Sequence, residues 1–351
     1  MEHRRSGTAG NRPVLLQYQG TGYLFIARLL LSMSVILAGA GCADNGTPDP
    51  PQNPPGQAQR IISLVPAVTD LLVEMGAAHR LVARTNFDRD GRLAALPSVG
   101  DGLSPGLEGL LAKQPDLVIS WPDAQARKLV TRLTEMGVAT YDARVETIDD
   151  VAVTALSLGR MLGLDSAATA LVERLGNQLD QVKRSVAERR KACILYVIHV
   201  NPPMSVGPGS FVHELIEIAG GRNVFADAGS PWPRVSLEEV IRRQPDMVVM
   251  ADANAAEHFP GTRAAIEYLQ SAPGWRELEA VRQGRVVAVD PYLFNRPGPR
   301  LGQAARQLAD LIHLEKPAAS QPADGSAGRS ADQPADRPAD DGSADRPADT
   351  P

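Results

Sequence analysis

The chain is poor in cysteine and in aromatic residues, and its net charge is small. Its 351 residues contain two cysteines, Cys42 and Cys193, and aromatic residues make up 4% of the sequence. Cys193 lies in the apolar run ACILYVIHV and is interpreted as a core residue, so no intrachain disulfide is expected. The net charge of -5 includes no basic patch of the kind that follows a phosphate backbone. Nucleic acid is therefore not expected as a partner.

The sequence also lacks the common signatures of catalysis. It has no histidine and cysteine cluster with metal-ligand spacing, no Gly-x-Ser-x-Gly turn, and no phosphate loop with its Lys-Ser/Thr pair. We therefore expect a binding protein that is not an enzyme, with no catalytic residues, no resident metal ion and no cofactor.

Both ends of the chain differ in composition from its body. An apolar run at 29–37 follows Arg28 and is too short to span a bilayer, and small residues precede Cys42. This pattern resembles the bacterial lipoprotein processing site and predicts a signal peptide over 1–42, with Cys42 lipidated in an exported protein anchored to the membrane, in the periplasm or at the cell surface. Residues 43–59 are a proline-rich tether. The PAD repeats of 315–351 contain too few apolar residues to offset the conformational entropy lost on folding, and they are predicted to be disordered.

Between these ends, short apolar runs alternate with amphipathic segments. The stretch LEGLLAKQPDLVI at 107–119 is similar to LEEVIRRQPDMVV at 237–249, which indicates an internal structural repeat. The alternation predicts an α/β fold with two Rossmann-like lobes, at 60–163 and 192–314, each with a mainly parallel sheet. The segment 164–191 predicts a rigid helix of about 26 residues, roughly 39 Å long, that joins the lobes. A ligand cleft is expected between the lobes, at the carboxyl ends of the strands.

Aromatic and small residues gather just after the predicted strands, although aromatic residues are scarce in the chain. Such side chains suit a large flat or amide-decorated ligand. The candidates identified by position are Pro66, Asn86, Phe87, Trp121, Gly207 within Asn201–Ser210, Trp232, Tyr292 and Phe294.

Several strings, taken in order, carry a resemblance to a known family. They are SLVPAVTDLL, QPDLVISW, NPPMSVGPGSFVHELIEIAGGRNVF, SPWPRVSLEEVIRRQPDMVV and FNRPGPRL. Together they resemble the solute-binding proteins of bacterial ABC importers for metal chelates, and in particular the cobalamin-binding branch. The resemblance covers about Arg60 to Leu314. It implies a rigid two-lobed binder that holds a corrinoid against aromatic residues, and it adds Met204 and Arg296 to the expected ligand contacts.

The same resemblance implies a partner. In this family one surface glutamate on each lobe meets arginine clusters on the permease dimer, which works with its ATPase, and Glu108 and Glu238 match those positions. The binder is expected to be a monomer. The alternative is that each carboxylate only complements a helix dipole, a contribution of about 0.3 to 1 kcal/mol.

Three other ligands or activities remain open. Haem is the first alternative ligand, with His199, His213, Tyr196 or Tyr292 as possible ligating residues. A ferric siderophore is less favoured, because an anionic chelate requires clustered arginines and only Arg84, Arg234 and Arg296 are near the expected cleft. An enzyme, a two-lobed nucleotide-sugar transferase, would rest on the VGPGSF turn at 206–211, but Pro208 lacks a backbone donor for phosphate.

Overall fold

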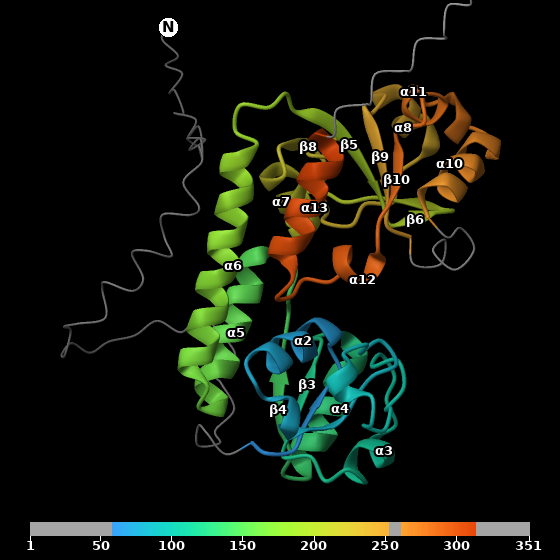
Figure 1. Ribbon diagram of the computed structural model, residues 1–351. Helices are drawn as coiled ribbons and strands as arrows, with labels where there is room; N and C mark the ends of the chain where they lie inside the picture. Colours follow the sequence, from blue (N-terminus) through green and yellow to red (C-terminus); the bar gives the residue numbers. More distant parts are fainter. Residues whose placement is uncertain (1–57, 253–260, 314–351) are drawn as a thin grey trace, which may run out of the picture. The chain divides into compact units, whose positions relative to one another are not determined.

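The computed structural model describes residues 58–252 and 261–313 (Figure 1). The predicted signal peptide at 1–42 with Cys42, nearly all of the tether and the PAD-repeat tail at 315–351 lie outside these residues. No helix in the described ranges has the length and apolarity needed to cross a membrane.

The first lobe is built on a four-stranded parallel sheet with the strand order β2-β1-β3-β4. Its strands are β1 (Ile61–Ser63), β2 (Leu81–Ala83), β3 (Leu117–Ser120) and β4 (Ala139–Asp142). Its helices are α2 (Pro66–Glu74), α3 (Leu107–Leu111) and α4 (Ala124–Glu135), with the 3-10 turns η1 (Ala78–Arg80) and η2 (Gly91–Leu93).

The second lobe repeats this topology. Its sheet has the order β10-β9-β5-β8, all parallel, so the first strand of each lobe lies between the second and the third. The strands are β5 (Ala192–Val197), β8 (Gly221–Asn223), β9 (Met247–Met250) and β10 (Val286–Ala288), with a small antiparallel hairpin of β6 (His199–Val200) and β7 (Pro203–Met204). The helices are α7 (Phe211–Ile218), α8 (Leu237–Arg243), α10 (Thr262–Ser271), α11 (Glu279–Arg282), α12 (Pro291–Phe294) and α13 (Leu301–His313), with the 3-10 turn η3 (Trp275–Glu277). The predicted fold class is confirmed.

The two copies of the repeated stretch fold alike in detail. Each has a glutamine in the left-handed region between its helix and its strand, Gln114 at φ 48° and Gln244 at φ 41°. A residue in this conformation stops a helix and redirects the chain, and for a non-glycine residue it costs roughly 1–2 kcal/mol. The same unfavourable conformation at both sites shows that the two stretches occupy equivalent positions.

The aspartate of each Gln-Pro-Asp triplet joins two strands. The Asp116 carboxylate accepts the amide N–H groups of Gln59 and Arg60, at 2.7 and 3.0 Å, just before β1. Asp246 accepts the N–H of Cys193 at 2.7 Å, at the start of β5. In both lobes the aspartate thus fixes the beginning of the third strand beside the beginning of the first.

The hydrophobic residues form three clusters. Along β5, Ile194 and Tyr196 face a large cluster shared by the lobes, whereas Leu195 and Val197 face a cluster confined to the second lobe. This alternation is the period of two that a strand buried on both faces requires. The first lobe has its own outer cluster as well, on the opposite face of its sheet.

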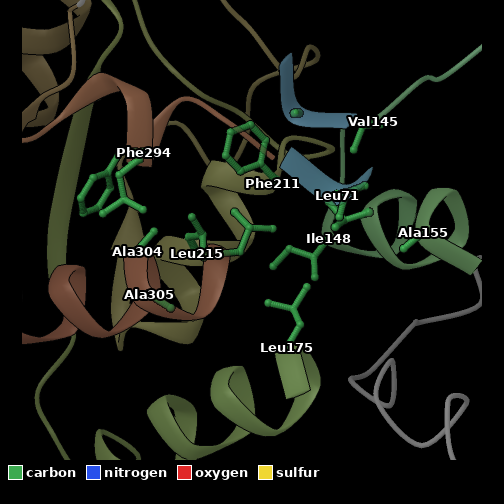
Figure 2. Packing of buried hydrophobic residues seen from close by; sticks show 14 of the residues in the cluster. Leu71, Val145, Ile148, Ala155, Leu175, Phe211, Leu215, Phe294, Ala304 and Ala305 are labelled. Carbon is green, nitrogen blue, oxygen red and sulfur yellow. The ribbon is translucent and has the colours of Figure 1, made fainter. Parts of the chain in front are cut away.

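The shared cluster continues from one lobe to the other (Figure 2). It includes Leu71 of α2, Ile148, Leu175, Phe211 of α7 and Ala304 of α13. The sheets therefore do not form two separately filled cores.

The helical connection between the lobes differs from the single helix expected over 164–191. It consists of α5 (Ile148–Leu162) and α6 (Asp165–Ser185), which lie side by side in Figure 1 and are joined at Gly163. Gly163 adopts φ 67° and ends α5. The 21 residues of α6 span about 31 Å. The helix ends before the charged segment at 187–191, and Val186 is buried beside Gly220.

Candidate functional site

A cavity of about 390 Å³ opens at the carboxyl ends of the strands, with walls from both lobes. Ligands of α/β proteins usually bind at this end of the strands. The lining is mostly apolar and comprises Val65, Pro66, Ala67, Phe87, Trp121, Val145, Glu146, Phe211, Trp232, Pro291, Tyr292, Asn295, Arg296 and Pro297.

Six of the ten ligand contacts expected from the sequence lie in this lining. They are Pro66, Phe87, Trp121, Trp232, Tyr292 and Arg296. Pro66 directly follows the loop after β1 and opens α2, where a proline fits the first helical turn. Trp121 immediately follows β3.

Two expected contacts point elsewhere. Phe294 is only 2% exposed and belongs to the shared core, and Figure 2 shows it beside Ala304. Tyr292, two residues earlier on the one-turn helix α12, faces the cavity instead. The Asn86 carboxamide oxygen accepts a hydrogen bond from the Ser98 hydroxyl at 2.6 Å, and Asn86 does not line the cavity.

The other two expected contacts belong to the backbone that supports the cavity. Met204 pairs with His199 in the β6-β7 hairpin and forms a bridge with Arg234. Gly207 donates its N–H to the carbonyl of Pro231 at 2.8 Å. A Cβ atom at Gly207 would collide with the carbonyl oxygen of Ser230, so only glycine fits. Both residues thus hold the loop that carries Trp232 without entering the lining.

Trp232 is supported by an aromatic residue that the sequence analysis did not select. The rings of Phe211 and Trp232 have centroids 6.0 Å apart and planes tilted by 60°. Phe211 begins α7 directly after Ser210, whose side chain caps the helix by accepting the N–H of His213. A serine before an apolar run is typical of a helix start. This signal at Ser210 could have placed Phe211 in the first turn of a helix near the cavity.

Tyr292 and Phe87 also line the cavity. The guanidinium of Arg89 lies 3.2 Å from the centroid of the Tyr292 ring, and that of Arg296 lies 5.8 Å away. A cation over the ring face favours a fixed ring orientation. Phe87 is 44% exposed, which is unusual for a large apolar side chain and places a hydrophobic surface at the cavity edge.

Charge in the lining is limited to Arg296 and Glu146. Arg296 donates to the Asp70 carboxylate at 3.1 Å and to the carbonyl of Phe87 at 2.6 Å. Burial raises the pKa of Asp70, and the two guanidiniums of Arg296 and Arg300 oppose that shift. Arg296 is therefore committed to an ion pair between the lobes.

Glu146 lies on the segment that leads into α5. Its backbone carbonyl accepts the N–H of Phe211 at 2.7 Å, which ties this segment to the second lobe. Within the described ranges its carboxylate has no hydrogen-bond or ion-pair partner. The unpaired charge of the lining is therefore negative.

Three of the four side chains considered as iron ligands do not line the cavity. His199 lies 3.6 Å from Asp252. His213 contacts the Asn223 carboxamide nitrogen at 3.1 Å, and burial lowers the pKa of His213. Tyr196 is fully buried and donates to Asn295 at 2.8 Å. Tyr292 is the one that lines the cavity, and the described residues contain no cluster of three or more histidine, cysteine or acidic side chains placed to hold a metal ion.

Glu108 and Glu238 occupy matching positions in the first turns of α3 and α8. Both are exposed, and neither side chain makes a hydrogen bond or ion pair within the part of the chain that the structure describes. Glu239, the neighbour of Glu238, instead pairs with Arg242 and Arg243. Each lobe thus presents an unengaged carboxylate at the matching position.

Comparison with known proteins gives similar folds and similar sequences. Residues 61–293 match the periplasmic binding protein family. The chain is 27% identical over 262 residues to the vitamin B12-binding protein of Vibrio cholerae serotype O1, covering 74% of this chain and 91% of that protein. It is similar to the solved periplasmic vitamin B12 binding protein of Vibrio cholerae, with a TM-score of 0.62 and 26% identity over 74% of this chain and 98% of the other. The periplasmic haem binding protein of the same species shares the fold, with a TM-score of 0.65 and 22% identity over 73% and 99%.

Proposed function

We infer, from the premise that this chain belongs to the periplasmic binding protein family, that it captures a corrinoid of the cobalamin type and delivers it to an ABC importer. Membership confirms the family predicted from the sequence motifs. The observation that carries the proposed ligand is an aromatic cavity whose single arginine is already paired. The names of the relatives, vitamin B12-binding proteins, support the same ligand.

The shape and polarity of the lining favour a large flat ring. Phe87, Trp121, Trp232 and Tyr292 provide wide apolar surfaces, and such side chains contribute most of the free energy of binding in pockets of this kind. The ring must be bulky, because it has to reach walls on both lobes.

The charge of the lining favours a ligand edged with neutral groups. A haem brings two carboxylates and a ferric siderophore is commonly anionic, and either requires a free cation. Arg296 is held by Asp70, and the Glu146 carboxylate would repel an anion. A corrinoid edged with carboxamides instead presents donors that a carboxylate accepts.

Haem is the second candidate, because one observation favours it. Tyr292 carries a phenol at the cavity surface, and tyrosine is a known ligand of haem iron. The shared fold with a haem binder adds no preference, since the same fold also serves vitamin B12 binding.

The third candidate, a nucleotide-dependent transferase, loses its main support in the structure. The N–H of Gly207 in the VGPGSF turn is donated to Pro231, and Pro208 has none. The turn therefore has few free amides to hold a phosphate.

The ligand is tested by titrating the purified protein with cyanocobalamin and with haemin in a calorimeter. We expect cyanocobalamin to bind more tightly. Trp121→Ala and Trp232→Ala should each weaken it by about tenfold or more, because each removes one aromatic wall. Trp275→Phe is the matched control, since Trp275 is buried in the outer cluster of the second lobe. Tighter haemin binding that disappears in Tyr292→Phe would establish the haem alternative.

We also propose that the protein is exported, as expected for a member of the periplasmic binding protein family, and that it is held at a membrane by lipid on Cys42. Cys42 lies outside the described residues. Replacing it with serine should move the protein from the membrane fraction to the soluble fraction of the source cells. Unchanged membrane association would show that the anchor lies elsewhere.

A further inference from the structure

A second cavity, of about 140 Å³, shares Trp121 with the main one. It lies in the first lobe, between the loop that contains Ser104 and the start of α4. Since Trp121 forms a wall of both cavities, a group attached to the edge of a ring in the main cavity lies close to the second. We propose that this second cavity is a subsite for a primary carboxamide on the edge of the ligand, an inference that rests on the proposed corrinoid function.

The polar side chains of the subsite are linked to one another and retain free acceptors. The Gln125 side-chain nitrogen donates to the Ser104 hydroxyl oxygen at 2.7 Å. This leaves the Gln125 carbonyl oxygen as an acceptor and the Ser104 hydroxyl proton as a donor. A primary carboxamide, which has both a donor nitrogen and an acceptor oxygen, complements this pair.

Asp123 gives the subsite a negative charge. Its Oδ1 atom accepts the backbone N–H groups of Gln125 and Ala126, at 2.8 and 2.7 Å, and so caps α4. Two amides of the helix end are therefore used by the Asp123 carboxylate, whose negative charge disfavours an anion at this site. Oδ2 has no partner in the described ranges and remains an acceptor.

No lysine or arginine lines the subsite. A carboxylate placed there would face Asp123 without a compensating cation, whereas a carboxamide N–H would donate to it. The subsite should therefore distinguish a ligand that carries amides from the corresponding acid. That distinction separates a finished corrinoid from its carboxylic acid precursors.

An exposed leucine stands beside the subsite. Leu103 is 67% exposed, the largest value among the large hydrophobic side chains of the described residues. The backbone just before it is fixed, because Gly102 adopts φ 82° and a Cβ atom there would collide with the Leu64 carbonyl. Leu103 is thus held where a bound ligand edge would cover it, which would remove its apolar surface from water.

The experiment compares two corrinoids that differ in their edge groups, dicyanocobinamide with carboxamides and dicyanocobyrinic acid with carboxylates. Each is titrated by calorimetry against the purified wild type, Asp123→Asn, Gln125→Leu and the control Asp310→Asn. Asn caps a helix as well as Asp, so Asp123→Asn removes the charge and keeps the fold. Asp310 is an exposed carboxylate on α13, away from both cavities.

We expect the wild type to prefer the amide form. Asp123→Asn should reduce that preference by about tenfold, mainly through tighter binding of the acid. Gln125→Leu should weaken cobinamide, and Asp310→Asn should change neither affinity. Thermal unfolding of each variant checks the fold, and Ser104→Ala replaces any variant that is not folded.

Two different results would overturn the inference, and they have different consequences for the proposed function. If the wild type binds cobinamide but Asp123→Asn and Gln125→Leu leave both affinities unchanged, the subsite is wrong and the proposed function stands. If the wild type binds neither corrinoid, the proposed function is wrong and the subsite falls with it.

Discussion

At the scale of single residues, Arg296 shows how a side chain at a cavity can serve the protein instead of the ligand. Its guanidinium bonds Asp70, 226 positions earlier in the chain, and the two side chains are 11% and 14% exposed. It also fixes the carbonyl of Phe87, whose ring lines the cavity. The pair therefore joins the lobes and orients one aromatic wall.

A double-mutant cycle tests this role. Asp70→Asn and Arg296→Met should each lower the free energy of unfolding by about 1–3 kcal/mol, because each leaves a mostly buried partner unsatisfied. The double variant should lose less than the sum, with a coupling of about 1 kcal/mol or more in urea denaturation.

The exposed pair of Arg263 and Glu267 provides the control cycle. Its side chains are 94% and 63% exposed, so its coupling should stay at or below about 0.5 kcal/mol. Additive effects of Asp70→Asn and Arg296→Met would mean that the ion pair does not join the lobes energetically.

At the scale of helices and strands, the alternation of apolar runs predicted the strands well, because the central strands are short and buried and because β3 and β9 each follow a Gln-Pro stop. The repeated stretch even indicated which helices and strands correspond. The paired helices α5 and α6 were not anticipated, since one amphipathic pattern does not reveal that a second helix covers its apolar face.

The cavity was predicted less completely, for a reason visible in α12. This helix has four residues, too few for a hydrophobic pattern to reveal which side faces the core. From the sequence, Tyr292 and Phe294 are equally plausible as ligand contacts. In the folded protein Tyr292 lines the cavity, whereas Phe294 packs in the shared core. Glu146 was missed because its place depends on a contact with Phe211, 65 residues later in the chain.

The loop that carries Trp232 supports a prediction at this scale. Gly207→Ala should displace that loop, because a Cβ atom would overlap the Ser230 carbonyl oxygen, and should weaken cyanocobalamin binding by about tenfold or more. Gly229→Ala is the matched control. Gly229 lies in the same loop, has no atom within 4 Å of an added Cβ, and should retain full affinity. Equal affinities for the two variants would show that the close approach at Gly207 does not position Trp232.

At the scale of the whole molecule, the duplicated topology places an exposed glutamate at a matching position on each lobe, Glu108 and Glu238. If Glu108 and Glu238 dock on the two halves of a permease, Glu108→Lys with Glu238→Lys should abolish uptake of radiolabelled cobalamin by the source cells. Affinity of the purified protein for cobalamin should remain unchanged, since neither residue lines the cavity.

The control for docking reverses two other carboxylates. Glu173 and Glu188 are exposed and lie outside the repeated stretch, so Glu173→Lys with Glu188→Lys makes the same change in net charge. Uptake should survive in that variant. Surviving uptake in the Glu108 and Glu238 variant would limit those glutamates to a helix-dipole role.

Ligand capture by the cavity and the proposed docking through Glu108 and Glu238 are expected to respond differently to ionic strength. Binding in a cavity whose arginine is already paired depends little on dissolved salt, because burial and shape carry it. An encounter guided by exposed Glu108 and Glu238 is screened as salt rises. Capture would then persist in concentrated media while delivery slows, so the two steps of transport could be separated by salt alone.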